Sequence, residues 1–212
     1  MKGGAGTTPL LVADHQKVTD SVDIAEWADA HAPEGGHIYP TGERERARGL
    51  VAGWTERLGP ATRRIPWEHF IAAPAGAVRW WSEGAPAWEL RIAPALIAAA
   101  KPAVRRKLRL SSEEIAAAPG IITEQFDRVA ELLSDGRPFL GGERFSILDI
   151  AFSAMASPAI CPPEGYPVRH FQPEDFPEAQ AERIRRFREH PAGAHALKMY
   201  AEHRSPATRG SY

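Results

Sequence analysis

One short segment of the chain combines side chains that could do chemistry together. Arg63 offers a guanidinium that clamps anions, and Trp67 offers an apolar wall. Glu68 and His69 follow as a pair suited to proton transfer. The alternative is that Trp67 and Phe70 are core residues and that the charged side chains are solvated.

This segment belongs to a long helical region. The spacing of apolar residues and of turn signals predicts helices at residues 42–58, 61–72, 87–109, 111–135, 146–157, 174–189 and 192–203. We expect Gly59–Pro60 to break the first of these and Pro119–Gly120 to interrupt the fourth.

The N-terminal part has a different pattern. Residues 8–14 are typical of a short strand entered through a proline, and residues 15–19 are typical of a turn and a second strand. An amphipathic helix follows over residues 20–28, with Ser21 as its expected N-cap. Considered alone, Asp20 and Ser21 are compatible with an ordinary helix cap.

Ser146 and Asp149 have the S-x-x-D spacing of a capping box. Residues 147–152 then follow with almost no polar interruption, so this helix should be buried nearly all round. A buried helix start has no water for its free N–H groups, which is why a capping box is needed there. Capping boxes are common, so the alternative is that this segment is simply a well-capped core helix.

The segment at 139–152, with Leu-Gly-Gly before Phe-Ser, resembles the buried central helix of the C-terminal domain of glutathione transferases. The segment at 7–31 resembles the second half of the thioredoxin-like domain of the same family. The resemblance implies a mainly α fold: an all-α C-terminal bundle preceded by a partial thioredoxin-like ββα unit. The resemblance implies a truncated thioredoxin-like portion at residues 1–32 and a linker at 33–40. The helical domain would then cover residues 41–204, followed by a tail at 205–212.

The resemblance also implies a glutathione site at Thr8, Pro9, Asp20 and Ser21. In the family the proline is cis, and the residue before it offers backbone groups to the glutathione cysteine. An acid–Ser pair at the helix start holds the γ-glutamyl end. This agrees with simple electrostatics, because a helix N-terminus suits an α-carboxylate and an aspartate suits an α-ammonium.

The second substrate of the family lies against the first helices of the C-terminal domain, which implies roles for Arg63, Trp67 and His69. The implied reaction is attack of the glutathione thiolate on a small electrophilic apolar substrate, or a glutathione-assisted isomerisation. Glutathione would be the co-substrate, and a homodimer is compatible with the family. The alternative is a non-catalytic binding or assembly module that uses the helical bundle.

No residue is assigned to catalysis. Only eight residues precede Pro9, whereas the family places a strand, a helix and a second strand there, with the thiol-activating residue among them. We therefore expect weak or absent transferase activity from this chain.

Composition excludes several other classes. Of the 212 residues, 43% are hydrophobic and 25% charged, and the net charge of −1 implies neither a nucleic acid nor an anionic membrane as partner. Cys161, the single cysteine, excludes an internal disulfide framework and favours the cytoplasm. No histidine spacing indicates a metal site, so none is expected. The basic run at 105–109 favours a solvated helix face.

Overall fold

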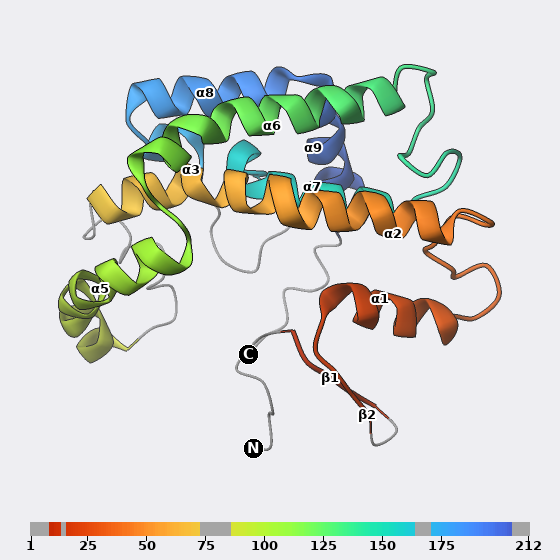
Figure 1. Ribbon diagram of the computed structural model, residues 1–212, viewed down its shortest axis with the longest axis horizontal. Coiled ribbons are helices and arrows are strands. Elements are labelled where there is room, and N and C mark those ends of the chain that lie inside the picture. Colours follow the sequence, from red (N-terminus) through yellow and green to blue (C-terminus); the bar gives the residue numbers. More distant parts are fainter. Residues whose placement is uncertain (1–8, 14–15, 73–85, 164–170, 205–212) are drawn as a thin grey trace.

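The computed structural model describes residues 9–13, 16–72, 86–163 and 171–204. Within these ranges the protein is mainly helical, with a two-stranded antiparallel hairpin near the N-terminus. Figure 1 shows most of the helices packed together, with the hairpin and the first helix beside one side of that bundle. The predicted mainly α class is confirmed.

The N-terminal unit is small. Strand β1 (Leu11–Ala13) pairs antiparallel with strand β2 (Gln16–Val18), and helix α1 (Ser21–Ala30) follows. Both strands were predicted, the first as a short run entered through Pro9 and the second as the segment after a turn. Because a two-stranded hairpin is marginally stable in isolation, its order depends on what packs around it.

Asp29, near the end of α1, joins this unit to the bundle. Its Oδ1 accepts the backbone N–H groups of Ile38 at 2.7 Å and Tyr39 at 3.0 Å, and its Oδ2 accepts from the Arg44 guanidinium. Further along the chain, the Ile147 N–H donates to the Ile38 carbonyl at 2.8 Å. The predicted linker is therefore held at both sides by hydrogen bonds.

We expect Asp29 to stabilise the fold fully above about pH 4 and to lose this contribution as the pH falls further. Burial raises the pKa of this carboxyl, but the N–H groups of Tyr39 and Ile38 and the Arg44 guanidinium outweigh burial, so the pKa lies below the ordinary 3.8. A carboxyl whose pKa is lower in the folded chain stabilises it above the unfolded pKa, and this contribution is lost as the pH falls through the folded pKa.

Urea unfolding of the wild type and of Asp29→Asn between about pH 7 and pH 3 measures this effect. The difference in unfolding free energy between the two should stay constant down to about pH 5 and shrink below about pH 4. A difference that is independent of pH would contradict the argument.

Helices α2 (Arg44–Gly53) and α3 (Gly59–Ala72) form one continuous run, joined by a π-helical turn at Trp54–Leu58. The break predicted at Gly59–Pro60 is therefore wrong. The first N–H after the turn donates to the carbonyl five residues back, so the turn takes up an extra residue and the chain passes the proline without leaving the helix. Figure 1 shows α2 and α3 running along one side of the bundle.

The other predicted helices are α5 (Ala87–Lys107), α6 (Ser112–Leu132), α7 (Ile147–Ile160), α8 (Glu178–Glu189) and α9 (Pro191–His203). The helix predicted at 174–189 begins four residues later than expected, because a separate 3-10 turn (Pro173–Asp175) precedes α8. The interruption predicted at Pro119–Gly120 is wrong, because α6 continues through it. A proline removes one backbone hydrogen bond, and a well-packed helix tolerates that loss with a kink. Among the described helices, none combines the length and the apolar character needed to cross a lipid bilayer.

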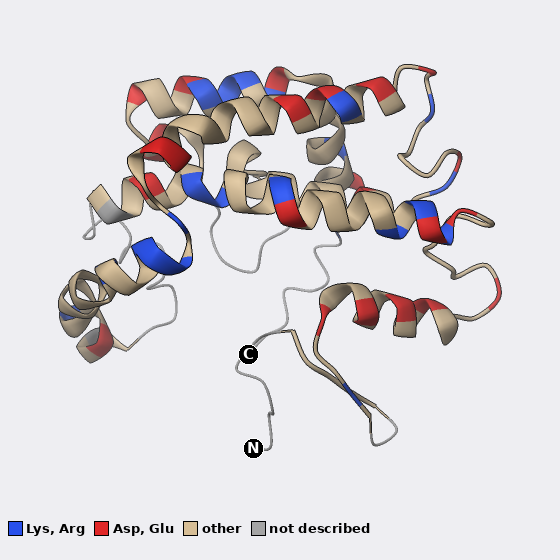
Figure 2. Ribbon diagram, in the orientation of Figure 1, with Lys and Arg blue, Asp and Glu red and all other residues tan. Residues whose placement is uncertain are grey.

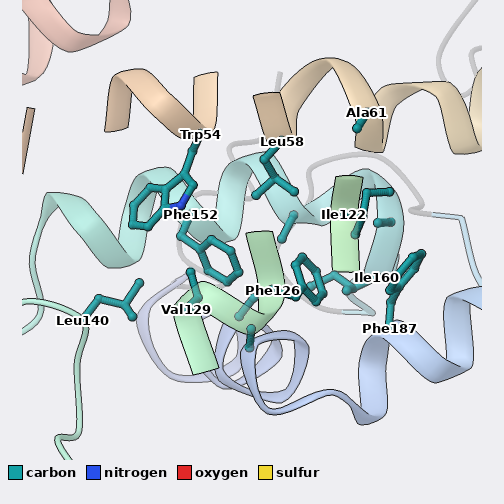
Figure 3. Packing of buried hydrophobic residues seen from close by; sticks show 14 of the residues in the cluster. Trp54, Leu58, Ala61, Ile122, Phe126, Val129, Leu140, Phe152, Ile160 and Phe187 are labelled. Carbon is teal, nitrogen blue, oxygen red and sulfur yellow. The ribbon is translucent and has the colours of Figure 1, made fainter. Parts of the chain in front are cut away.

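Helix α7 lies at the centre of the bundle, in contact with α2, α3, α8 and α9. Most of its side chains are buried, and Ile150 and Ala154 form an exposed stripe. The prediction of a helix buried nearly all round is confirmed apart from that stripe. Figure 3 shows Phe152 of α7 among the core rings. Its ring centroid lies 5.4 Å from that of Trp54 and 5.6 Å from that of Phe126. Each large apolar side chain buried here contributes about 1.5–3 kcal/mol.

Candidate functional site

The N-terminus of α1 is the first candidate site. Asp20 is the N-cap of this helix, and its Oδ1 accepts the Val22 backbone N–H at 2.8 Å. Ser21 is the first helical residue, so the prediction of Ser21 as N-cap is wrong by one position. The physical reason is that the extended backbone of Asp20 aims its carboxylate at a free N–H of the first turn.

The surroundings of this helix start are open. Asp20, Ser21 and Pro9 are all exposed, and Val12 on β1 is 64% exposed. Thr8 lies outside the described residues, and so does the Thr8–Pro9 peptide bond that the resemblance implies to be cis. Figure 2 shows acidic segments along α1 and no basic ones, a field that favours a cationic group.

Arg63, Trp67 and His69 all lie on α3, and two of them contact the same aromatic ring. Arg63 is exposed, and Trp67, four residues later, lies on the same face of the helix. The Trp67 ring packs edge-on against Phe70, with 5.9 Å between centroids. The His69 ring packs edge-on against the same Phe70 at 6.0 Å and against Phe176 at 5.4 Å. The structure therefore brings Trp67 and His69 together around Phe70, whereas Arg63 lies next to a different feature.

That feature is a cavity of about 330 Å³ between α3, the end of α5 and the start of α6. We call it the basic pocket, after the five basic side chains in its lining: Arg57, Arg63, Arg64, Lys107 and Arg109. Glu56 and Glu114 are its acidic lining residues. Of this set, only Arg63 was predicted to contact a ligand.

Arg64 is the buried member of the basic pocket. Its side chain is 7% exposed and pairs through one terminal nitrogen with Glu114, while its Nε has no hydrogen-bond partner among the described residues. Burial lowers the pKa of Arg64, and the nearby positive charges of Arg109 and Arg63 lower it further. The Arg64 guanidinium thus lies among positive charges that the one neighbouring carboxylate, Glu114, does not fully balance.

The basic run at 105–109 contributes to this pocket through Lys107 and Arg109, although both side chains are largely exposed. Arg109 has a backbone φ of 52°, in the left-handed region that residues other than glycine rarely adopt. The prediction of a solvated helix face did not anticipate that Lys107 and Arg109 line a pocket. No local signal could have revealed it, because the facing arginines belong to α3.

The start of α7 is a second polar cluster. The predicted capping box is formed, and Oδ2 of Asp149 accepts from the Ser146 backbone N–H at 3.0 Å and from the Ser146 hydroxyl at 2.9 Å. The other oxygen, Oδ1, accepts the Leu140 backbone N–H at 2.8 Å and lies 3.0 Å from Nε2 of His195. Asp149 is fully buried and joins the preceding loop, α7 and α9. Asp149 borders a cavity, but its carboxylate oxygens are already engaged by the backbone and side-chain partners named above, which indicates a structural role.

His195 was missed by sequence reasoning. It lies 46 positions beyond Asp149 and is buried on α9, with no motif around it that signals the contact. Ser153, one turn after Asp149, has a buried hydroxyl without a partner among the described residues and lines a second, mainly apolar cavity of about 250 Å³.

Cys161 offers no reactive thiol. It is buried at the C-terminus of α7, and burial raises its pKa to about 12 even though the nearby Arg188 guanidinium lowers it. Because the thiolate is the reactive form, this cysteine is inert at neutral pH. The described part of the chain also contains no group of three His, Cys, Asp or Glu side chains arranged to hold a metal ion.

Comparison of this chain with models of known protein families, with curated proteins and with solved structures finds no match.

Proposed function

We propose that this protein is glutathione transferase-like and binds glutathione at the N-terminus of α1. The observation that carries the proposal is the exposed Asp20–Ser21 pair at a helix start that directly follows an antiparallel hairpin. The helical bundle, built around a central helix with a capping box, supports it as the counterpart of that family's C-terminal domain. The hairpin and α1 would then be part of a thioredoxin-like domain.

Asp20 would bind the α-ammonium of the γ-glutamyl group. Its Oδ1 is occupied by the Val22 N–H, and its Oδ2 has no hydrogen-bond partner among the described residues. The α-carboxylate would lie at the helix N-terminus beside Ser21, where the helix dipole favours negative charge. Thr8 and Pro9 would align the cysteine portion of the tripeptide.

In this proposal a small apolar electrophile is the second substrate and lies along α3. Arg63 and Trp67 share one face of that helix, and His69 would extend the wall on the adjoining face. No residue is assigned to thiol activation. The cytoplasm, where glutathione keeps thiols reduced, is the expected compartment, and a homodimer is compatible with this proposal.

The second candidate function is a non-catalytic binding module. It is favoured by Cys161, whose raised pKa leaves the chain without a reactive thiol of its own. This candidate uses the helical bundle as its ligand or partner surface and does not require glutathione at α1. Glutathione binding that depends on Asp20 therefore favours the first candidate, and conjugation of glutathione to an aryl halide by the purified protein would favour it further.

We expect Asp20→Asn to weaken glutathione binding about tenfold, because it removes the charge that pairs with the α-ammonium. Asparagine is as good an N-cap as aspartate, so the helix start is retained. Isothermal titration calorimetry with glutathione measures the affinity.

Asp23→Asn is the matched control, since Asp23 is an exposed acid in the first turn of the same helix. Its affinity for glutathione should stay close to that of the wild type. Equal weakening by both substitutions would indicate only a general charge effect, and no binding by the wild type would overturn the proposal.

A further inference from the structure

The basic pocket brings together side chains that are far apart in the sequence. Arg63 and Arg64 come from α3, Lys107 from the end of α5, Arg109 from the connection that follows, and Glu114 from the first turn of α6. Figure 2 shows basic segments on α3 and at the end of α5 that lies towards it. A volume of about 330 Å³ lies within the range of small-molecule sites.

The hydrogen bonding of Arg64 is incomplete. One of its terminal nitrogens pairs with Glu114, but its buried Nε has no acceptor among the described residues. A buried donor without an acceptor costs free energy, so such groups usually have a partner that completes them. An anion in the pocket, next to Arg64, would supply that acceptor.

The carboxylates in and around the pocket are too few for its cations. Glu114 is shared, because its Oε1 also lies 2.9 Å from the Arg109 guanidinium. Arg57 pairs with Glu124, outside the lining, at 2.9 Å. Glu56, Glu114 and Glu124 are the three carboxylates, and the pocket has five basic side chains. The basic pocket therefore carries an excess of two positive charges.

Two of the basic side chains are available to a ligand. Arg63 and Lys107 are exposed and have no ion-pair partner within the described part of the chain. The Nε of Arg63 donates to the Gly59 carbonyl at 3.1 Å, which fixes the side chain along α3 and leaves its terminal nitrogens for another acceptor. Lys107, at the end of α5, adds a compact point charge to the lining.

We propose that the basic pocket binds a small anion that carries at least two negative charges on phosphate or carboxylate groups. The planar guanidiniums of Arg63 and Arg64 match the geometry of such oxyanions, and Lys107 and Arg109 add two further positive charges to the lining. A dianion balances the excess charge and gives the buried Nε of Arg64 its acceptor. The site is separate from the helix start of α1, and the proposal is independent of glutathione binding.

A solvated basic surface is the alternative, since exposed basic runs are common. It accounts for Lys107 and Arg109 but not for Arg64. A side chain that is 7% exposed has given up most of its hydration, and its one carboxylate partner is shared with a second guanidinium. Selective binding of multiply charged anions distinguishes the two.

Pyrophosphate is the first probe, used with the purified full chain in calorimetry at low ionic strength. We expect binding that weakens as salt is added, and about tenfold lower affinity in Arg63→Gln and in Lys107→Gln. Arg106→Gln is the matched control, because Arg106 is an exposed neighbour on α5 that does not line the pocket. Its affinity should stay within about twofold of the wild type.

Glu114→Gln provides a test in the opposite direction. Removing this carboxylate frees the guanidiniums of Arg64 and Arg109, so pyrophosphate should bind about tenfold more tightly. Melting curves without ligand show whether each variant is folded. Citrate is the second probe, and tighter binding of citrate than of pyrophosphate would identify carboxylate as the preferred group. Acetate, which carries one charge, should not bind detectably.

The proposal is overturned if pyrophosphate and citrate both fail to bind the folded wild type, or if Arg106→Gln weakens binding as much as Lys107→Gln. Asp20→Asn should leave pyrophosphate binding unchanged, and Lys107→Gln should leave glutathione binding unchanged. Failure of one site can therefore be distinguished from failure of the other.

Discussion

Replacing Asp149 by alanine is expected to lower the free energy of unfolding by about 3–5 kcal/mol. The substitution leaves the backbone N–H groups of Leu140 and Ser146 buried without an acceptor, and it removes the partner of His195 on α9. Each buried donor left unpaired costs about 1–3 kcal/mol, so the effect exceeds the loss of an ordinary helix cap. Urea unfolding followed by circular dichroism measures the change.

Ser146→Ala separates the capping box from the rest of this cluster. It removes the hydroxyl but keeps Asp149 and its contacts to Leu140 and His195, so it should cost only about 1–2 kcal/mol. Neither substitution should alter the affinity for glutathione or pyrophosphate in the folded protein. Equal destabilisation by both substitutions would show that Asp149 acts only as part of the cap.

Replacing Gly193 by alanine is expected to destabilise the protein by about 3 kcal/mol or more. Gly193 lies in the first turn of α9, where that helix crosses the end of α8. A Cβ built on it would overlap the carbonyl oxygen of Phe187 and lie 2.9 Å from the carbonyl carbon. Both atoms belong to the backbone of a helix, so the contact can be relieved only by moving α8 and α9 apart.

Gly120→Ala is the matched control for this substitution. Gly120 lies inside α6, and a Cβ there would meet no atom within 4 Å. Alanine is favoured over glycine in a helix by about 0.5–1 kcal/mol, so this variant should be more stable than the wild type. Thermal melting of the two variants should shift in opposite directions, and a Gly193→Ala protein as stable as the wild type would contradict the close packing of α8 on α9.

The predictions that held depend on neighbouring residues. The capping box of Ser146 and Asp149 spans three positions, and the helices and the hairpin follow from apolar periodicity over a few turns. The predictions that failed used equally local signals in places where packing overrode them. Gly59–Pro60 should end a helix by its own preferences, yet a π-helical turn takes up the extra residue and keeps the apolar face of α2 and α3 against α7.

The sequence by itself determined the helical character, the order of the elements and the cap of α7, because these depend on hydrogen bonds and side-chain spacing within about two turns of the chain. Tertiary structure alone decided which charges meet. The Arg64–Glu114 pair joins positions 50 apart, and the contact of Asp149 with His195 joins positions 46 apart. Such pairs depend on how helix faces pack, and packing follows from the shapes of many side chains at once, which no local pattern encodes.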